Sequence, residues 1–165
     1  MTKLVVVTGA SGGMGRQTCK VFKDYGYLVI GTDVHESQDL SVDHFFQGEI
    51  THEVMWQEIA KHIQTTNGQL NSLINIAGRN YLANISEADL GEWRNMMEVN
   101  VLGMVAAIKH MSPLLKKAQN SSIVNMSSIS GLIGSIGYAA YCTSKGAIDS
   151  LTKSLALELA PEVRD

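Results

Sequence analysis

Short runs of apolar residues alternate with amphipathic segments along the chain. Residues 3–8 and 27–33 are rich in Val, Leu and Ile, which predicts two buried strands. Between them a helical pattern extends from about Gly15 to Tyr25, and Gly26 ends it. Similar apolar runs predict further strands near residues 44–48 and within residues 70–78 and 121–128.

Three later segments have the spacing of helices. The first has Val54, Ile59 and Ile63 on one face and is closed by Asn67 and Gly68. The others are a long helix through residues 92–111 and a last helix from about Tyr138 to Leu159, before Pro161. Strands that alternate with helices predict an α/β fold, namely a Rossmann-type doubly wound parallel sheet in a three-layer α/β/α arrangement. We expect residues 1–165 to form a single domain of this kind.

The composition is that of an ordinary globular domain. The chain has 165 residues, of which 45% are hydrophobic and 18% charged, and its net charge is −3. Because it has no run of Lys or Arg, a nucleic-acid or anionic-membrane partner is not expected. Its apolar runs are far shorter than the roughly 20 residues that span a bilayer. The N-terminus has no signal-peptide core, so we expect a cytoplasmic protein.

Metal and redox chemistry are not expected. Cys19 and Cys142 fall in helical patterns without CxxC spacing, which favours small buried apolar side chains. The five histidines never recur at the spacing of metal ligands. We therefore predict no metal site.

The segment "TGASGGMG", residues 8–15, follows the first predicted strand. Because Gly9, Gly13 and Gly15 lack Cβ atoms, a pyrophosphate can approach the backbone N–H groups and the positive end of the following helix. The spacing is not G-x-G-x-x-G, and no Gly-Lys-Ser/Thr follows to make it a P-loop. The alternative is a tight turn that binds no ligand.

Asp33 ends the second predicted strand, 18 residues after Gly15. A carboxylate at this place can accept hydrogen bonds from an adenosine ribose, although an aspartate that only caps a turn is the alternative. The same carboxylate would repel a 2′-phosphate, and Val34 and Gly12 offer no cation to neutralise one. We therefore predict NAD rather than NADP. A methyltransferase, which also uses a glycine turn and an acidic residue, stays possible on these features alone.

Tyr141 and Lys145 are four residues apart and so share one face of the last predicted helix. The pair alone is weak evidence, but it follows a strand that ends in Ser127 and Ser128, with Asn100 in the preceding helix. An ammonium about 5 Å from a phenol, at an effective dielectric near 20, favours the phenolate by roughly 3 kcal/mol. The alternatives are a solvated lysine, a loop hydroxyl at Ser128 and a helix-bending polar residue at Asn100.

Taken in order, these motifs resemble those of the short-chain dehydrogenase/reductase family, from Thr8 to the end of the chain. The corresponding motifs are "TGASGGMG" for the family's TGxxxGxG turn, "NIAG" (Asn75 to Gly78) for NNAG with Ile76 in place of the second Asn, "NVLG" (Asn100 to Gly103) for NVxG, and Tyr141 to Lys145 for YxxxK. Ser128 lies 13 residues before Tyr141, which is the family's usual interval for its catalytic serine, so Ser128 is preferred to Ser127.

The resemblance implies hydride transfer between NAD(H) and a small-molecule alcohol or ketone. Tyr141 would be the general acid or base, Lys145 would stabilise its phenolate and hold the nicotinamide ribose, and Ser128 would stabilise the substrate oxygen. Asn100 would hold a water that relays protons through Lys145. Cofactor contacts are expected from Gly9, Ser11, Gly13, Met14, Gly15, Asp33, Asn75, Ala77, Gly78, Tyr141 and Lys145, and from Glu49 and Ile50, which stand where the family often has Asp-Val or Asp-Leu.

The C-terminal end departs from the family pattern. The family usually continues beyond the YxxxK helix with further strands and a substrate lid. We therefore expect a C-terminally shortened sheet of five strands in the order 3-2-1-4-5, with residues 122–126 as an exposed apolar edge. A catalytically silent dinucleotide-binding or interaction module is the alternative to an active enzyme.

Two apolar segments bear on partners and substrate. Residues 99–111 are apolar nearly all round a helix, which predicts a homodimer or homotetramer through the two C-terminal helices. Residues 131–137 ("GLIGSIG") predict an apolar, pliable substrate wall. Such a wall is compatible with sugars, acyl thioesters, steroids or small ketones, so the sequence leaves the substrate open.

Overall fold

A computed structural model describes residues 2–164, and the two terminal residues of the expected domain lie outside this range. Within it, the chain forms a parallel six-stranded sheet in the order β3-β2-β1-β4-β5-β6. The strands are β1 (Leu4–Thr8), β2 (Leu28–Asp33), β3 (His44–Gln47), β4 (Ser72–Asn75), β5 (Ser121–Asn125) and β6 (Val163–Arg164). The Rossmann-type α/β fold expected from the sequence is confirmed.

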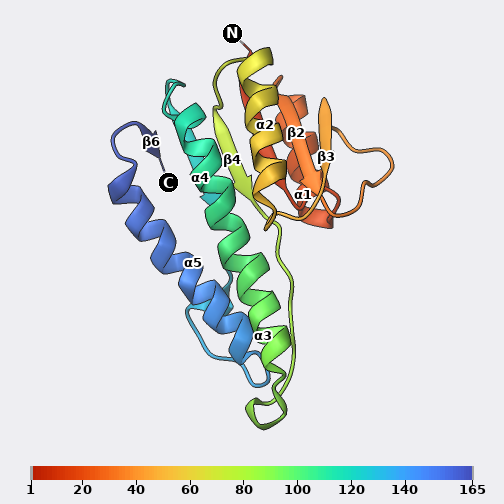
Figure 1. The fold of residues 1–165 in the computed structure, drawn as a ribbon, viewed down its shortest axis with the longest axis vertical. Coiled ribbons are helices and arrows are strands. Elements are labelled where there is room, and N and C mark those ends of the chain that lie inside the picture. The colour runs from red at the N-terminus through yellow and green to blue at the C-terminus, as the bar shows by residue number, and fades with distance from the viewer. Residues whose placement is uncertain (1, 165) are drawn as a thin grey trace.

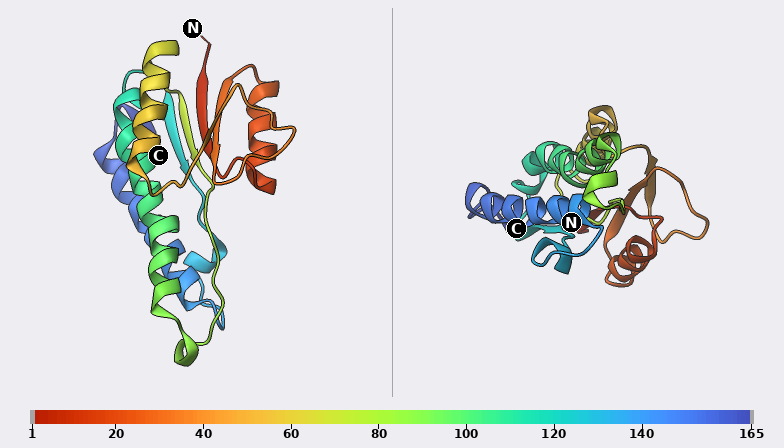
Figure 2. Two further views of the ribbon diagram at one scale, coloured as in Figure 1. Left: turned by 45° about the vertical axis from the view of Figure 1, so that its right-hand side comes forward. Right: turned by 90° about the horizontal axis from the view of Figure 1, so that it is seen from below.

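Helices cover both faces of this sheet (Figures 1 and 2). The α-helices are α1 (Gly13–Asp24), α2 (Glu53–Thr66), α3 (Leu90–Met97), α4 (Gly103–Leu115) and α5 (Ala139–Glu158). Short helical turns are η1 (Ile85–Glu87), η2 (Glu98–Leu102) and η3 (Ile129–Gly131). The left view of Figure 2 shows α1 on one side of the sheet and α2, α4 and α5 on the other, which makes three layers.

The alternation of side chains along β1 explains this layering. All five residues of β1 are buried. Val5 and Val7 pack with Cys19 of α1, whereas Leu4 and Val6 belong to the larger core with α2 and α4. Since successive side chains of a strand point to opposite faces, this one buried strand supplies both cores.

The expectation of a five-stranded sheet is wrong. After α5 the chain turns back, and Val163 and Arg164 pair in parallel with Ser121 and Ser122 of β5. This sixth strand has two residues and carried no period that could have been read from the sequence. Of the expected exposed edge, residues 122–126, only Ser122 pairs with β6. Ile123 is buried in the larger core, while Val124 is exposed.

Two helix predictions also need correction. Val54 does not lie on the buried face of α2, because 65% of its surface is exposed. The buried residues of that helix are Met55, Trp56, Ile59 and Ile63, and Trp56 Nε1 donates a hydrogen bond to the Ile50 carbonyl at 2.7 Å. The long helix over residues 92–111 is interrupted by a π-helical turn, η2. Within residues 2–164, no helix combines the length and apolar character needed to cross a bilayer.

Candidate active site

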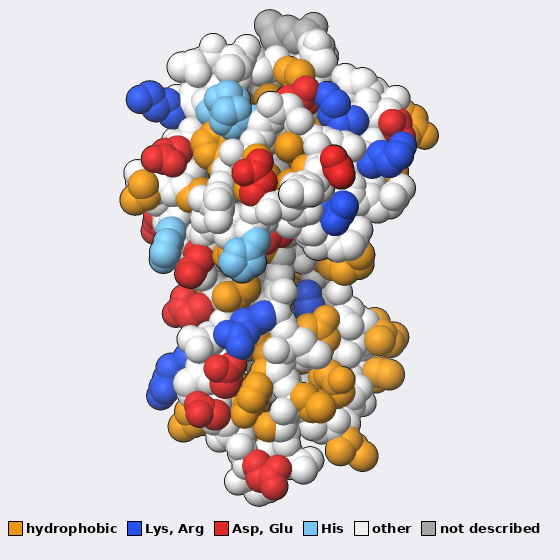
Figure 3. Space-filling model, turned by 90° about the vertical axis from the view of Figure 1, so that its right-hand side faces the viewer, with side chains coloured by type: hydrophobic (Ala, Val, Ile, Leu, Met, Phe, Trp, Pro, Cys, Tyr) orange, Lys and Arg blue, Asp and Glu red, His pale blue; other side chains and the backbone are white. Residues whose placement is uncertain are grey.

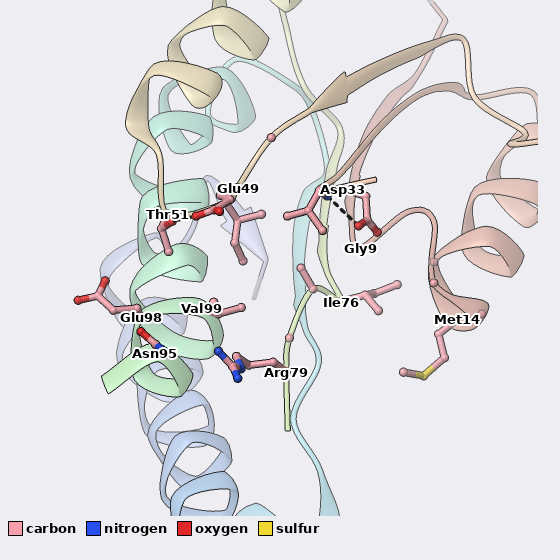
Figure 4. A pocket seen from close by; sticks show the side chains of 18 residues that line it. Gly9, Met14, Asp33, Glu49, Thr51, Ile76, Arg79, Asn95, Glu98 and Val99 are labelled. Atoms are coloured by element: carbon pink, nitrogen blue, oxygen red, sulfur yellow. Dashed lines mark hydrogen bonds between the residues drawn. The ribbon is translucent and has the colours of Figure 1, made fainter. Parts of the chain in front are cut away.

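An open cavity of about 740 Å³ lies at the carboxyl ends of β1, β2, β3 and β4. Figure 4 shows Asp33 and Glu49 near one end of it and Arg79 and Asn95 near the other. Its wall consists of Gly9, Gly12, Gly13, Met14, Gly15, Asp33, Val34, Gly48, Glu49, Ile50, Thr51, Ile76, Ala77, Gly78, Arg79, Asn95, Glu98 and Val99. This is the position at which open parallel sheets bind ligands.

The glycine turn is fixed by close backbone contacts. Gly9 has φ +67°, and a Cβ there would lie 2.9 Å from the Ala77 nitrogen. A Cβ at Gly15 would lie 2.0 Å from the Gly9 carbonyl oxygen. Gly13 differs, because a Cβ there would meet nothing within 4 Å. Gly9 and Gly15 therefore allow the turn itself, whereas Gly13 only keeps the cavity wall free of a side chain.

The N-terminus of α1 is free to receive an anion. Gly12 is its N-cap residue and provides no side-chain cap, and its first turn carries no acidic residue. The N–H groups of such a turn have no partner within the helix and lie at the positive end of the helix dipole. Because Gly12, Gly13 and Met14 line the cavity, this turn can hold a phosphate group of a ligand there.

Asp33 lines the same cavity from the end of β2. Its Oδ2 accepts a hydrogen bond from the Ser11 N–H at 3.0 Å, and its Oδ1 accepts one from the Val34 N–H at 2.8 Å. The carboxylate thus braces the glycine turn and still borders open space. The turn-capping interpretation of Asp33 and the ribose-binding interpretation are therefore compatible.

The other expected cofactor residues divide into two groups. Glu49, Ile50, Ala77 and Gly78 line the cavity, together with Met14. Ser11 and Asn75 lie outside the lining, as do Tyr141 and Lys145. The Ser11 hydroxyl donates to the His35 carbonyl, and Asn75 Nδ2 donates to Asn125 Oδ1 at 2.9 Å. Asn75 is buried and links β4 to β5, so its contacts here are those of a sheet residue.

Part of the lining was not predicted from the sequence. Gly12, Val34, Gly48, Thr51 and Ile76 adjoin residues that it named, so their neighbours were the signal. Three further lining residues share one helix face, because Glu98 and Val99 follow Asn95 by three and four positions. This spacing could have indicated all three once one of them was known to line the cavity. Arg79 carried no signal of its own; its guanidinium pairs with the Glu92 carboxylate.

Tyr141 and Lys145 lie together at the start of α5. Lys145 Nζ is 5.6 Å from the centre of the Tyr141 ring and donates a hydrogen bond to the Met126 carbonyl at 2.7 Å. Only 4% of the lysine surface is exposed. Burial lowers the pKa of Lys145 below its ordinary value, and the negative charge of Asp149 partly opposes this shift. A buried ammonium is thus held beside a phenol.

Asn100 joins this pair to the cavity. It is fully buried in η2, and its Oδ1 accepts from the Arg79 N–H at 2.8 Å. Its Nδ2 donates to the Arg79 carbonyl and to Ser144 Oγ, both at 3.0 Å. Ser144 precedes Lys145, and Arg79 lines the cavity, so one amide connects the two sites. A π-helical turn of this kind is common at functional sites.

The two serines after β5 have different contacts. Ser127 Oγ donates to the Lys145 carbonyl at 3.3 Å and so fastens the loop to α5. Ser128 Oγ accepts from the Ser130 N–H at 3.2 Å and caps η3. A hydroxyl that accepts a bond still has its own proton to donate. Ser128 therefore suits a role toward a substrate oxygen better than Ser127 does.

The fold and these contacts define a Rossmann-type protein with a glycine turn at the N-terminus of α1 and a tyrosine beside a buried lysine. The sequence profile of the short chain dehydrogenase family matches residues 3–164. The chain therefore belongs to the short-chain dehydrogenase/reductase family, and the resemblance drawn from its motifs is confirmed.

Related proteins of known activity are similar over nearly the whole chain. Cyclopentanol dehydrogenase of Comamonas testosteroni is 32% identical over 169 residues, covering 96% of this chain and 68% of that protein. L-fucose dehydrogenase of Mus musculus is 35% identical over 163 residues, covering 94% of this chain and 59% of that protein. The chain thus spans 59% to 68% of the length of these two relatives.

Solved structures agree on the fold. Ligand-free aldohexose dehydrogenase of Thermoplasma acidophilum superimposes with a TM-score of 0.93 at 36% identity, covering 99% of this chain and 64% of that one. NAD⁺-bound xylitol dehydrogenase gives 0.90 at 26% identity, with coverages of 98% and 66%. ElxO with NADP bound gives 0.90 at 28% identity, with coverages of 99% and 71%. Relatives thus bind NAD or NADP.

Proposed function

We propose that this chain carries the hydride-transfer centre of an oxidoreductase acting between NAD(H) and an alcohol or carbonyl compound. The observation that carries the proposal is the buried Lys145 ammonium, 5.6 Å from the centre of the Tyr141 ring. A lysine buried without a carboxylate within ion-pair distance is unusual unless its charge has a use. Here we assign that charge to catalysis, in which it would stabilise negative charge that develops on the Tyr141 oxygen.

The residues at the cavity fit the cofactor. The glycine turn and the α1 N-terminus would hold the pyrophosphate, Asp33 the adenosine ribose, and the residues after β3 and β4 the adenine and the nicotinamide side. When bound, the nicotinamide supplies or accepts the hydride at the substrate carbon.

Side chains of the protein would transfer the proton. In alcohol oxidation Tyr141 takes the proton of the substrate hydroxyl as the C–H bond breaks and the carbonyl forms; in reduction it returns that proton. Lys145 stabilises the phenolate in between, and the Ser128 hydroxyl donates a hydrogen bond to the substrate oxygen. Both Asn100 Nδ2 protons are already donated within the protein, so its proposed water would bind another of its atoms.

The test of this function is the substitution Tyr141→Phe, which removes only the phenolic hydroxyl. We expect turnover to fall by about a thousandfold, since general acid–base catalysis contributes 10²- to 10⁴-fold. NADH affinity, measured by fluorescence titration, should stay within a few fold. The control is Tyr138→Phe, one turn earlier, which should retain turnover. Equal turnover in the two variants would refute the role of Tyr141, and NADH binding without turnover of any alcohol in the unaltered chain would support a silent binding module.

We also propose NAD as the preferred cofactor. Asp33 places a negative charge at the cavity, and Arg79, at the far end, is the sole Lys or Arg in the described lining (Figure 4). A 2′-phosphate beside Asp33 would therefore be repelled. We expect kcat/KM with NAD⁺ to exceed that with NADP⁺ at least about tenfold, and Asp33→Asn to reduce this preference while the exposed control Asp39→Asn does not. A preference for NADP⁺ would contradict the proposed role of Asp33.

We further propose a homodimer or homotetramer through α4 and α5. Leu102 and Val105 are exposed at and near the start of α4, and Leu157 near the end of α5. Burying such side chains against a second copy would be favourable. Multi-angle light scattering should then give a mass of two or four chains, and a single-chain mass at micromolar concentration would count against it.

The substrate class is open between two kinds of alcohol. Among the relatives, one is named for cyclopentanol and others for sugars.

A further inference from the structure

Exposed apolar side chains gather on two loops beside the start of α5. We call Leu82, Ile129, Leu132, Ile133 and Ile136 the loop patch; all five are exposed, and Ile136 has 93% of its surface accessible. Four of them lie between β5 and α5, and Leu82 lies on the loop after β4. Figure 3 shows hydrophobic side chains gathered on the lower half of the molecule, whereas charged and histidine side chains are more frequent on the upper half.

The two loops are fastened to each other. The Ala83 N–H donates to the Gly137 carbonyl at 3.0 Å. A Cβ at Gly137 would lie 2.9 Å from Leu82 Cδ1, so Leu82 packs directly on the loop before α5. The patch is therefore one surface built from two segments distant in sequence.

This surface adjoins the proposed catalytic residues. Ser128 directly precedes Ile129, and Tyr141 and Lys145 follow the loop on α5. Gly131 lies against the turn that carries Lys145, since a Cβ at Gly131 would be 2.9 Å from the Lys145 carbonyl carbon. Cys142, the neighbour of Tyr141, contacts the Ile133 carbonyl through Sγ at 3.8 Å. These contacts hold the loop that carries the patch against α5 at Cys142, the neighbour of Tyr141, and at Lys145.

The same segment carries no charge. Residues 126–144 contain no Asp, Glu, Lys, Arg or His. Two of its serines, Ser127 and Ser144, donate their hydroxyl protons to backbone carbonyl groups. Arg79 and Glu92, which precede and follow Leu82 in the sequence, neutralise each other in an ion pair. A polyhydroxylated substrate would leave several hydroxyls against this surface without hydrogen-bond partners, which is costly.

We propose that the substrate of this site is a secondary alcohol, or the matching ketone, on an apolar carbon frame such as an alicyclic ring, with no other polar group near the reacting oxygen. The loop patch covers the frame, and Ser128 and Tyr141 bind the oxygen. An apolar wall with a few polar groups at one point is the usual make-up of a small-molecule site. This inference rests on the proposed function, whose catalytic residues it extends.

The first experiment compares substrates on the unaltered protein with NAD⁺. We expect kcat/KM for cyclopentanol and cyclohexanol to exceed that for L-fucose and D-glucose by at least 100-fold, because apolar contacts each discriminate by about tenfold or more. Equal or higher values for the sugars would overturn the inference and leave the proposed function standing.

The second experiment substitutes the patch. Leu132→Ser and Ile136→Ser should each lower kcat/KM for cyclohexanol about tenfold, with the KM for NAD⁺ unchanged. The matched control is Val54→Ser, because Val54 is 65% exposed but lies on α2, away from the two loops of the patch. If the patch variants behave like the control, or instead change the mass found by light scattering, the patch does not bind substrate and the inference is wrong.

A binding measurement separates this inference from the proposed function. In Tyr141→Phe with NADH, saturation-transfer NMR should show contact of the protein with the ring protons of cyclohexanone and none with L-fucose, and Ile136→Ser should weaken the contact. If the unaltered protein turns over no alcohol, the proposed function fails; contact with fucose alone, or with neither compound, would overturn the substrate class.

Discussion

The cavity at the glycine turn and the tyrosine–lysine site at α5 are built in opposite ways. At the glycine turn, side chains are absent so that backbone segments approach: a Cβ at Gly15 would lie 2.0 Å from the Gly9 carbonyl oxygen. At α5, polar side chains are present and buried, as Asn100 and Lys145 are. The first site should therefore fail through steric overlap, and the second through loss of hydrogen bonds and charge.

The two sites also present different chemical groups to a ligand. The glycine turn presents backbone N–H groups, which recognise a phosphate whatever else the ligand carries. The α5 site presents a phenol, a serine hydroxyl and the loop patch, and we propose that this patch selects one kind of carbon frame. Relatives can therefore share a cofactor and differ in substrate, because one site is built from backbone and the other from side chains.

The largest effect on folding is expected from Gly15→Ala. Its Cβ would overlap the backbone of Gly9 and Ala10, which cannot move without opening the turn. We expect the free energy of unfolding, measured in urea, to fall by about 3 kcal/mol or more. Gly13→Ala is the matched control, because its Cβ meets nothing within 4 Å and Ala favours a helix.

The two variants test the backbone-built site jointly. Gly13→Ala should keep or slightly raise stability while weakening NADH binding, since Gly13 lines the cavity. A Gly15→Ala variant as stable as Gly13→Ala would contradict the steric account of the turn.

Features set by short-range patterns could be predicted from the sequence. The strand runs, the glycine turn and Asp33 depend on neighbours in the chain, and the structure has the strands, the turn and Asp33 where they were expected. Val54 was misplaced because the face of α2 is set by Trp56, whose indole N–H reaches the Ile50 carbonyl across a turn. β6 was missed because two residues gain their strand conformation only from pairing with β5.

The site residues that were not predicted from the sequence have the same explanation. Arg79 enters the cavity wall because Asn100, 21 residues away, binds both its N–H and its carbonyl group. No period in the sequence encodes such a contact between a loop and a π-helical turn. The loop patch was partly foreseen in "GLIGSIG", but Leu82 joins it only through packing on Gly137.

A smaller effect is expected from Asn100→Ala, which tests the side-chain-built site. The substitution leaves the Arg79 N–H and carbonyl groups without their buried partner and frees Ser144 from η2. Since a buried unsatisfied group costs 1–3 kcal/mol, we expect a loss of about 2 kcal/mol in urea unfolding. The exposed Asn95→Ala, in the preceding helix, should change stability by less than about 0.5 kcal/mol.

Asn100 also connects the two sites, so its loss should lower turnover at saturating NAD⁺ as well as stability. If Asn100→Ala were as stable as Asn95→Ala, the hydrogen bonds of Asn100 would not carry the connection. A loss of NADH affinity without any loss of stability would mean that Asn100 acts on the bound cofactor and does not connect the cavity to α5.

The smallest effect concerns the two thiols, one in each of the helices that begin at the two sites. Burial raises the pKa of the Cys19 thiol, in α1, to about 11, and the side chain has no exposed surface. Cys142, in α5 beside Tyr141, is only half-buried. At pH 8 we expect a disulfide reagent such as DTNB to label one thiol per folded chain quickly and the second only after unfolding, because the thiolate is the reacting form.

The assignment of each thiol follows from Cys142→Ala, which should remove the fast phase and keep the slow one. The pH dependence has a definite sign: between about 9 and 11 the unfolded chain loses the Cys19 proton before the folded one does, so stability falls as pH rises through this window. Fast labelling of Cys142→Ala would mean that α1 opens readily. The glycine turn at its start would then be the more mobile of the two sites, which would contradict the close packing described for it.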